Sequence, residues 1–483
     1  MWRYSLHYTH TLGHPVQPTG LCVEAIVAAG VSLAFAGAIL QGPLREEALR
    51  AALHVAERLQ DPTSALRASQ AANSQSHFPA FTHWSPPSIG QGNAGLCLLW
   101  AYLDECFPGQ GWDVTGKSHL EIAGRAAEMS PNLGISLFAG LSGLAFAGWQ
   151  LSRGGVRYQR FLLSLDDAIS LDATELAARV LHSDYVSMND FDVISGLSGI
   201  GAYLLARHER AVTGAALAAV VDALILLVTR EGALPAWHTP AYLLFDDTAR
   251  KNYPQGNLNC GLAHGIPGVL AFLSLVHLAG LSFEHLEEAI LTIATWLSTH
   301  RLDDEWGVNW SSAVALKATE FDGQVALTEV DIENSPGGAS RTAWCYGSPG
   351  IARSLWLAGR AVDRDDLKQL AVNALEAVFR RPIAARMIDS PTFCHGVAGL
   401  LAIAMRFANE TGSPLFRDEC QKLTAQILST FQPDSLLGFR NLEYGGNQTD
   451  QPGFLDGASG VAAVLLSASV GIEPRWDRVF LLS

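Results

Sequence analysis

The sequence CHGVAGL at residues 394–400 contains a five-residue phrase, GVAGL, in which a glycine precedes two small or apolar residues, a second glycine and an aliphatic residue. A phrase of this form occurs seven times along the chain. The copies are GNAGL at 92–96, GLSGL at 140–144, GLSGI at 196–200, GIPGV at 265–269, GSPGI at 347–351, GVAGL at 396–400 and GASGV at 457–461. One copy would indicate only a turn, whereas seven indicate a repeat architecture.

Each phrase lies between two helical patterns. The stretch before it is amphipathic, which predicts an outer helix, and the stretch after it is more uniformly apolar, as at 268–278 and 460–469, which predicts a buried inner helix. The fourth stretch of the outer series is apolar throughout. The expected outer helices are 44–59, 119–129, 171–182, 211–230, 283–300, 365–380 and 416–430.

Seven alternating hairpins cannot bury their apolar faces singly, so they must stack on one another. An open solenoid would need a polar terminal repeat, yet the last unit ends in the apolar residues 479–482. We therefore predict an all-α fold, an α/α toroid of seven helical hairpins, forming a single domain over 1–483 with repeats at about 44–470. The longer connection 306–343, with a β-like piece at 325–330, is expected to be an excursion over one mouth of the ring.

Composition limits the possible functions. Apolar residues make up 49% and charged residues 16% of the chain, which is typical of a globular protein, and the net charge of −15 disfavours nucleic-acid binding. Seven scattered cysteines favour a reducing compartment.

Residues 23–40 are predicted to form a buried first helix, with membrane contact as the alternative. Because no signal-peptide pattern is present, we expect a cytoplasmic protein.

The residues just before the phrases should converge on one mouth of the ring. The position four residues before the second glycine holds Gln91, Ala139, Ser195, His264, Tyr346, His395 and Asp456. The preceding position holds Cys345 and Cys394 in two consecutive repeats.

Cys345, Cys394 and His395 therefore offer three ligands of the kinds that zinc prefers, and a three-ligand site leaves the fourth position for water or substrate. Each cysteine also precedes an inner helix, whose N-terminal dipole favours a thiolate. The alternative is that both thiols serve only packing. The other five cysteines, at 22, 97, 106, 260 and 420, lack this register and are expected to be structural.

At these residues the sequence resembles the lanthionine synthetase C-like family. The matching segments are NCGLAHGIPG at 259–268, WCYGSPG at 344–350 and CHG at 394–396, and DVISGLSG at 192–199 is similar to an earlier acidic motif of the family. The resemblance implies an α/α toroid with one catalytic Zn²⁺ per chain. It also implies a lanthipeptide cyclase, which adds cysteine thiols of a precursor peptide to dehydroalanine or dehydrobutyrine to form thioether rings.

The chemistry of such an addition suits the residues. A thiol with a pKa of about 8.5 is mostly protonated at neutral pH, and zinc deprotonates a coordinated thiol. The addition creates an enolate that needs a proton, for which His264 is the expected acid. Asp192 would orient His264 or stabilise its charged form, or else serve as a helix cap.

Three further residues receive weaker assignments. The resemblance places Arg341 and Tyr346 near the enolate, although Arg341 could equally bind surface carboxylates. Asp456 shares the register and is expected only to line the mouth.

Two other functions remain open. The zinc could activate water or present glutathione to a modified protein, as in another branch of the family, or the toroid could be a non-catalytic module that binds a peptide or partner. Because no dehydratase-like region precedes the repeats, we expect a stand-alone cyclase. Its partners would be a dehydrated precursor peptide and a separate dehydratase, possible members of a peripheral membrane-associated complex.

Overall fold

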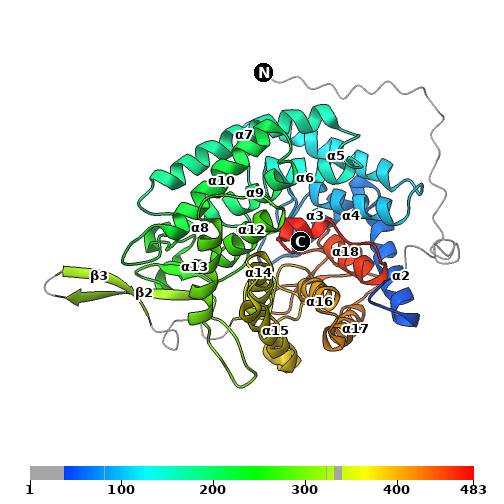
Figure 1. Cartoon of the computed structure of the whole chain (residues 1–483). Coiled ribbons are helices and arrows are strands. Elements are labelled where there is room, and N and C mark those ends of the chain that lie inside the picture. Colours follow the sequence, from blue (N-terminus) through cyan, green and yellow to red (C-terminus); the bar gives the residue numbers. More distant parts are fainter. Residues whose placement is uncertain (1–36, 81, 322–323, 331–339) are drawn as a thin grey trace.

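The structure, a computed structural model, describes residues 37–80, 82–321, 324–330 and 340–483 (Figure 1). Most of the helix expected at 23–40 lies outside these residues. The last part of that stretch is buried but not helical, and the Leu40 backbone N–H donates to the carbonyl of Ala468 at 3.1 Å. The described start of the chain is thereby tied to its last long helix.

Seven inner and seven outer helices alternate along the described chain (Figure 1). The inner helices are α4 (Asn93–Cys106), α6 (Leu141–Leu151), α9 (Leu197–Ala206), α12 (Ile266–Leu278), α14 (Ser348–Ala361), α16 (Val397–Thr411) and α18 (Ala458–Ser469). The outer helices are α2 (Gly42–Leu59), α5 (Trp112–Glu128), α7 (Gln159–His182), α10 (Ala211–Thr229), α13 (Leu286–Thr299), α15 (Asp365–Arg380) and α17 (Pro414–Leu428).

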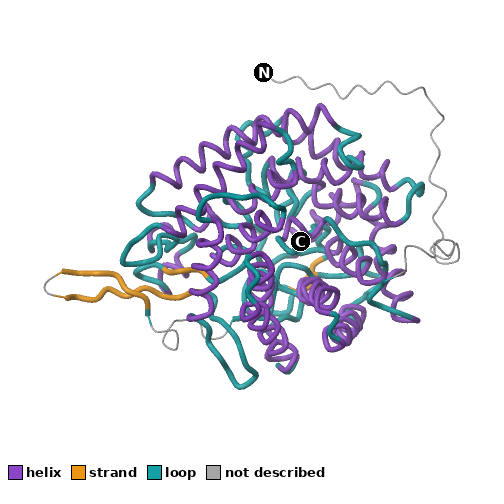
Figure 2. Tube along the Cα trace, viewed as in Figure 1, coloured by secondary structure: helices purple, strands orange, loops and turns teal. Residues whose placement is uncertain are grey.

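The inner helices form a closed ring (Figure 2). Each contacts the next along the chain, and α18 contacts both α16 and the first inner helix, α4. Helix α2 completes the outer layer by packing against α17 and α18. The predicted toroid of seven hairpins is confirmed.

A circle of backbone hydrogen bonds joins the segments that precede the inner helices. Because each segment bonds to the next and the last bonds to the first, the side chains at equivalent positions face one region. The bonds run from Gly90 N to Phe138 O (3.3 Å), Phe138 N to Ile194 O (3.2 Å), Val193 N to Ala263 O (3.1 Å), Ala263 N to Cys345 O (3.2 Å), Cys345 N to Cys394 O (3.2 Å), Cys394 N to Leu455 O (3.0 Å) and Leu455 N to Gly90 O (3.1 Å).

The two glycines of the phrase have separate structural roles. The first is the N-cap of its inner helix in all seven repeats. At the second, a Cβ atom would lie 1.9–2.5 Å from the carbonyl oxygen of the residue six positions earlier. In the sixth repeat, for example, a Cβ on Gly399 would be 2.1 Å from the oxygen of Phe393. Only glycine lets the incoming segment approach the helix this closely.

The C-terminal segment fills the centre of the ring (Figure 1). Phe480, in the short helix η4 (Trp476–Phe480), is fully buried, and its ring centroid lies 3.7 Å from that of Phe393 and 5.0 Å from that of Trp344. These two partners precede the second glycines of adjacent repeats by six residues. The apolar end noted in the sequence is therefore a plug within the closed ring.

The 306–343 connection contains a β-hairpin. Strand β2 (Ala313–Phe321) pairs antiparallel with β3 (Gln324–Glu329), and the base of β2 pairs with β1 (Asn257–Asn259), placing Asn259 opposite Ala313. The hairpin projects sideways from the body of the ring instead of lying over a mouth (Figures 1 and 2), which corrects that part of our expectation. Residues 331–339 lie outside the described residues.

Smaller elements complete the fold, and local sequence explains several of their ends. Asp61 caps the first additional helix by accepting a hydrogen bond from Thr63 N, and Ser187 with Asp190 forms a capping box at the second. The elements are α3 (Pro62–Gln75), α8 (Met188–Phe191), α11 (Asp247–Asn252), η1 (Ala241–Leu243), η3 (Ile383–Arg386), β4 (Asn441–Leu442) and β5 (Gln448–Thr449).

One described helix, α10, is long and apolar enough to cross a membrane by length and composition. It packs against α7, α9 and α13, and 56% of its apolar window is buried inside the molecule. These contacts account for its apolar composition within the toroid.

Candidate metal and acid–base site

Cys345 and Cys394 occupy equivalent positions in adjacent repeats, just before α14 and α16. The Cys345 N–H donates to the Cys394 carbonyl at 3.2 Å, so the two residues are neighbours in the backbone circle. Cys345 is buried and Cys394 is partly buried. The sequence register thus brings the two thiols together, as expected.

The Cys394 thiol lies in an environment that disfavours a second negative charge. A side-chain hydrogen bond with Cys345, burial and nearby negative charge raise its pKa well above the ordinary value, while Arg341 opposes them. A bound metal ion would oppose these effects and stabilise the ionised form of the Cys394 thiol.

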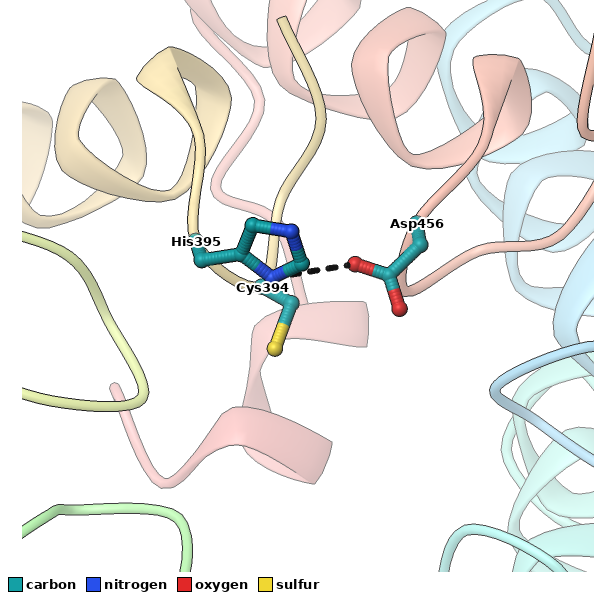
Figure 3. Close-up of side chains that lie close together, drawn as sticks. All are labelled: Cys394, His395 and Asp456. Carbon is teal, nitrogen blue, oxygen red and sulfur yellow. Dashed lines mark ion pairs between the residues drawn. The ribbon is translucent and has the colours of Figure 1, made fainter. Parts of the chain in front are cut away.

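His395 and Asp456 complete a cluster around Cys394 (Figure 3). One ligand atom from each of the three residues lies within 4.8 Å of the other two. His395 Nδ1 is 3.5 Å from Asp456 Oδ1, an oxygen that is buried and has no hydrogen-bond partner in the structure. Cys345 adjoins Cys394 but is not part of this three-residue cluster.

The donor set fits zinc. Two cysteine sulfurs and an imidazole are ligands found at tetrahedral zinc centres, and the carboxylate of Asp456 beside His395 is of a type that zinc also binds. The cysteines precede the N-termini of α14 and α16, where helix dipoles favour thiolates. Cys345, Cys394 and His395 can therefore hold the ion expected from the sequence.

His264 and Asp192 form the second polar group at this mouth. Asp192 Oδ2 lies 2.6 Å from His264 Nδ1, and Asp192 is fully buried whereas 34% of the His264 side chain is exposed. With Nδ1 engaged, Nε2 is the nitrogen left to exchange protons with a ligand.

Asp192 contacts His264 but does not cap helix α9. Its Oδ1 accepts hydrogen bonds from the backbone N–H groups of Ser195 and Gly196 at 2.6 and 2.8 Å, in the turn before α9, and the helix itself has no side-chain cap. Its Oδ2 lies against His264 Nδ1. One carboxylate therefore fixes both this turn and the imidazole.

Tyr346 lies between the two groups. Its ring centroid is 6.4 Å from that of His264, and its hydroxyl oxygen accepts a hydrogen bond from Asn259 Nδ2 at 3.1 Å. Burial is the main cause of its raised pKa, so the phenol stays protonated. Asn259 opens the NCGLAHG segment but carried no predicted role of its own. Its Oδ1 also accepts a hydrogen bond from Gly261 N.

Arg341 is exposed, and its charge acts on Cys394 and Asp456. The pKa of Cys394 is raised mainly by its hydrogen bond with Cys345 and that of Asp456 by burial, and Arg341 opposes both shifts. The guanidinium therefore contributes positive potential at this cluster.

A cavity of about 500 Å³ lies among the C-terminal ends of α12, α14 and α16, at the end of these helices away from Cys345 and Cys394. Its charged groups pair with one another: Arg353 and Arg360 bind Glu410, and Arg406 binds Asp477. This end of the ring is stabilised by its ion pairs, and we do not assign it a catalytic role.

Comparisons with known proteins agree with this geometry. A family model described as lanthionine synthetase C-like protein matches residues 83–481. The chain is 28% identical over 351 residues to the nisin biosynthesis protein NisC of Lactococcus lactis subsp. lactis, covering 72% of this chain and 77% of that protein. Its fold is similar to a solved structure of nisin cyclase, with a TM-score of 0.68, 23% identity, and coverage of 86% of this chain and 97% of that one.

Proposed function

Because this chain belongs to the lanthionine synthetase C-like family, we propose that it is a zinc-dependent lanthipeptide cyclase. In the reaction, a cysteine sulfur of the substrate forms a bond to the β-carbon of a dehydroalanine or dehydrobutyrine. The thiol loses its proton, and the α-carbon gains one. The observation that carries the proposal is a pair of adjacent cysteines beside His395, at the same mouth as the Asp192–His264 pair.

Cys345, Cys394 and His395 would hold the zinc ion, one per chain. When bound, zinc would lower the pKa of the substrate thiol so that its sulfur can act as a nucleophile at neutral pH. The protein thiols are fixed by the backbone circle that joins Cys345 to Cys394. Because this backbone is fixed, both sulfur ligands would already be in position before the substrate binds.

His264 would deliver the proton to the α-carbon. Asp192 is anchored by two backbone N–H groups and holds the imidazole through Nδ1, which would leave Nε2 to transfer the proton. Tyr346 and Arg341 would stabilise the enolate oxygen, Tyr346 by its hydroxyl and Arg341 by its charge.

We further infer the setting of the reaction. The substrate would be a dehydrated precursor peptide supplied by a separate dehydratase, in the cytoplasm and within a complex that can lie at the membrane surface. We propose that the toroid and its hairpin act as a single domain over 1–483.

The test is incubation of the zinc-loaded protein with a dehydrated peptide that carries one free cysteine. We expect no change in mass and loss of the free thiol, measured by thiol alkylation and fragmentation mass spectrometry. A mass increase by one glutathione when glutathione is supplied would instead support a glutathione-adding enzyme. Binding without any covalent change would support a non-catalytic toroid.

A further inference from the structure

The side-chain amide of Asn259, at the end of strand β1, is held at both of its polar ends. Its Oδ1 accepts a hydrogen bond from the Gly261 backbone N–H at 2.8 Å. Its Nδ2 donates to the Tyr346 hydroxyl oxygen at 3.1 Å and lies 3.8 Å from the Met188 sulfur. Because the residue is also buried, the amide keeps one orientation.

The Gly261 N–H decides which end of this amide faces Tyr346. A backbone N–H can only donate, so the amide atom that meets it must be the oxygen. The other end, Nδ2, is then a donor, and the Tyr346 hydroxyl can only accept from it. The hydrogen bond therefore has a single direction, and the Tyr346 proton points away from Asn259.

The Tyr346 ring is fixed by close packing as well. A Cβ atom at Gly261 would lie 2.6 Å from the ring carbon Cε1 and 2.7 Å from the Cys345 carbonyl oxygen. Only glycine lets the chain pass this close to the ring. Within the described part of the chain, no residue accepts the Tyr346 hydroxyl proton. The phenol is thus held in place with its proton left for a ligand.

The segment that holds Tyr346 also carries the proposed acid. His264 follows Asn259 by five residues, and the turn between them is closed by a hydrogen bond from Gly265 N to Gly261 O at 2.7 Å. The ring centroids of His264 and Tyr346 are 6.4 Å apart. One short turn therefore sets the relative positions of the two groups.

We infer that Asn259 is a positioning residue that directs the Tyr346 hydroxyl proton toward the enolate oxygen of the substrate. The inference rests on the proposed cyclase function and adds a residue to it. As the substrate sulfur bonds to the β-carbon, the π electrons of the dehydro residue move onto its carbonyl oxygen. Tyr346 would donate a hydrogen bond to that oxygen and keep its proton, and the charge would leave the oxygen when the α-carbon is protonated. A donor aimed in advance needs no reorganisation during the reaction.

Asn259→Asp tests the direction of this hydrogen bond, because it keeps the side-chain shape and an oxygen for the Gly261 N–H. Its second oxygen is an acceptor where Nδ2 was a donor, so the Tyr346 proton should turn toward residue 259 and away from the substrate. For a dehydrated peptide with one free cysteine, kcat should fall about tenfold, as in Tyr346→Phe, with KM and zinc content unchanged. Circular dichroism verifies folding.

The same change in the Tyr346→Phe background controls for the added negative charge, because that variant has no hydroxyl proton to redirect. There Asn259→Asp should alter kcat by less than about twofold. Asn252→Asp, which adds the charge at an exposed position at the end of α11, should keep wild-type kinetics. A wild-type kcat in Asn259→Asp, or an equal fall in both backgrounds, would overturn the inference.

If Asn259→Asp fails to fold, a crystal structure of the wild type with an unreactive peptide decides the question. In this peptide an alanine replaces the dehydroalanine. A Tyr346 hydroxyl oxygen within about 3.0 Å of the alanine carbonyl oxygen supports the inference, and a separation above about 3.5 Å contradicts it. The two proposals also fail differently. A wild type that forms no thioether would refute the proposed function, whereas a wild type that cyclises no faster than Asn259→Asp would refute only this further inference.

Discussion

The two polar groups at the mouth differ in how fully the protein satisfies them. In the Asp192–His264 pair, each carboxylate oxygen has its partners and the contact to the imidazole is 2.6 Å. In the cluster of Cys394, His395 and Asp456, the imidazole and carboxylate stand 3.5 Å apart and a buried oxygen has no hydrogen bond.

This difference separates a group that protein contacts complete from one that a bound ion could complete. A satisfied network of hydrogen bonds keeps its geometry without a ligand. Unpaired buried donors and acceptors cost free energy, and a cation shared among them removes that cost. Mutations in the first group should therefore change proton transfer while zinc stays bound, and mutations in the second should change metal binding.

The largest expected effect follows from removing the acid of the satisfied pair. His264→Ala should retain zinc but slow cyclisation by about 10³-fold, because the enolate loses its proton donor. The measurement is the rate of thiol loss in a dehydrated peptide, together with zinc content. His277→Ala, near the C-terminal end of the helix α12 that His264 precedes, is the matched control and should cyclise normally. A fully active His264→Ala would assign the acid to another residue.

A smaller effect is expected from altering the residue that orients the acid. Asp192→Asn keeps an oxygen for the N–H groups of Ser195 and Gly196 but loses the charge beside His264, so cyclisation should fall by about 10²-fold with little change in stability. Asp192→Ala leaves two N–H groups without an acceptor and should also lower the free energy of unfolding by about 2 kcal/mol, measured by urea denaturation. Equal stabilities of the two variants would contradict a stabilising role for these two hydrogen bonds.

A still smaller effect is expected for Tyr346, which lies between the two groups. Tyr346→Phe should slow cyclisation by about tenfold. A dedicated oxyanion donor would be worth about 10²-fold, but here Arg341 would still stabilise the enolate oxygen. Zinc content should not change. Loss of zinc in this variant would mean that the tyrosine supports the metal site instead.

The smallest effect concerns an ion pair outside both groups, at the base of the hairpin. His300 Nε2 lies 2.6 Å from Glu329 Oε2. Although burial opposes both shifts, hydrogen bonding within the pair raises the pKa of His300 above 6.5 and lowers that of Glu329 below 4.5. The histidine contribution to stability is lost as pH rises through the raised pKa, and the glutamate contribution is lost as pH falls through the lowered one.

Glu329→Gln should therefore destabilise the hairpin most between pH 4.5 and 6.5, the interval bounded by the unshifted values. The expected cost is less than about 1 kcal/mol, because both side chains are partly exposed. Hydrogen exchange of the β2–β3 amides measures it, and cyclisation should not change. A cost that is independent of pH would indicate a loss of packing rather than of the ion pair.

The repeats could be predicted because they leave a periodic signal. The GVAGL-type phrase specifies where each inner helix starts, and the first glycine is the N-cap in every repeat. Outer-helix boundaries were less predictable. Helix α7 begins at Gln159, twelve residues before the expected start at 171. Its first turns are amphipathic too, although we expected those residues to belong to the connection before the helix.

The register also predicted which site residues meet, but not how. It placed Cys345 beside Cys394, whereas Asp192 was placed near His264 by the acidic motif at 192–199. Neither could show that Asp192 also holds the turn before α9 through the N–H groups of Ser195 and Gly196. Asn259 was missed because its role depends on a contact across repeats. Asp456 was placed in the lining of the mouth, but its contact with His395 could not be predicted. The sideways course of the hairpin depends on the pairing of β1 with β2, which joins segments more than fifty residues apart.

The most direct measurement is the zinc content of the purified wild type and of Cys345→Ala after dialysis, determined by mass spectrometry of the metal. The two-cysteine site predicts about one zinc per chain in the wild type and a large loss in Cys345→Ala. Cys97→Ala, which removes a buried thiol on α4 far from the register, should keep its zinc. A wild type without zinc, or equal zinc in wild type and Cys345→Ala, would contradict the account.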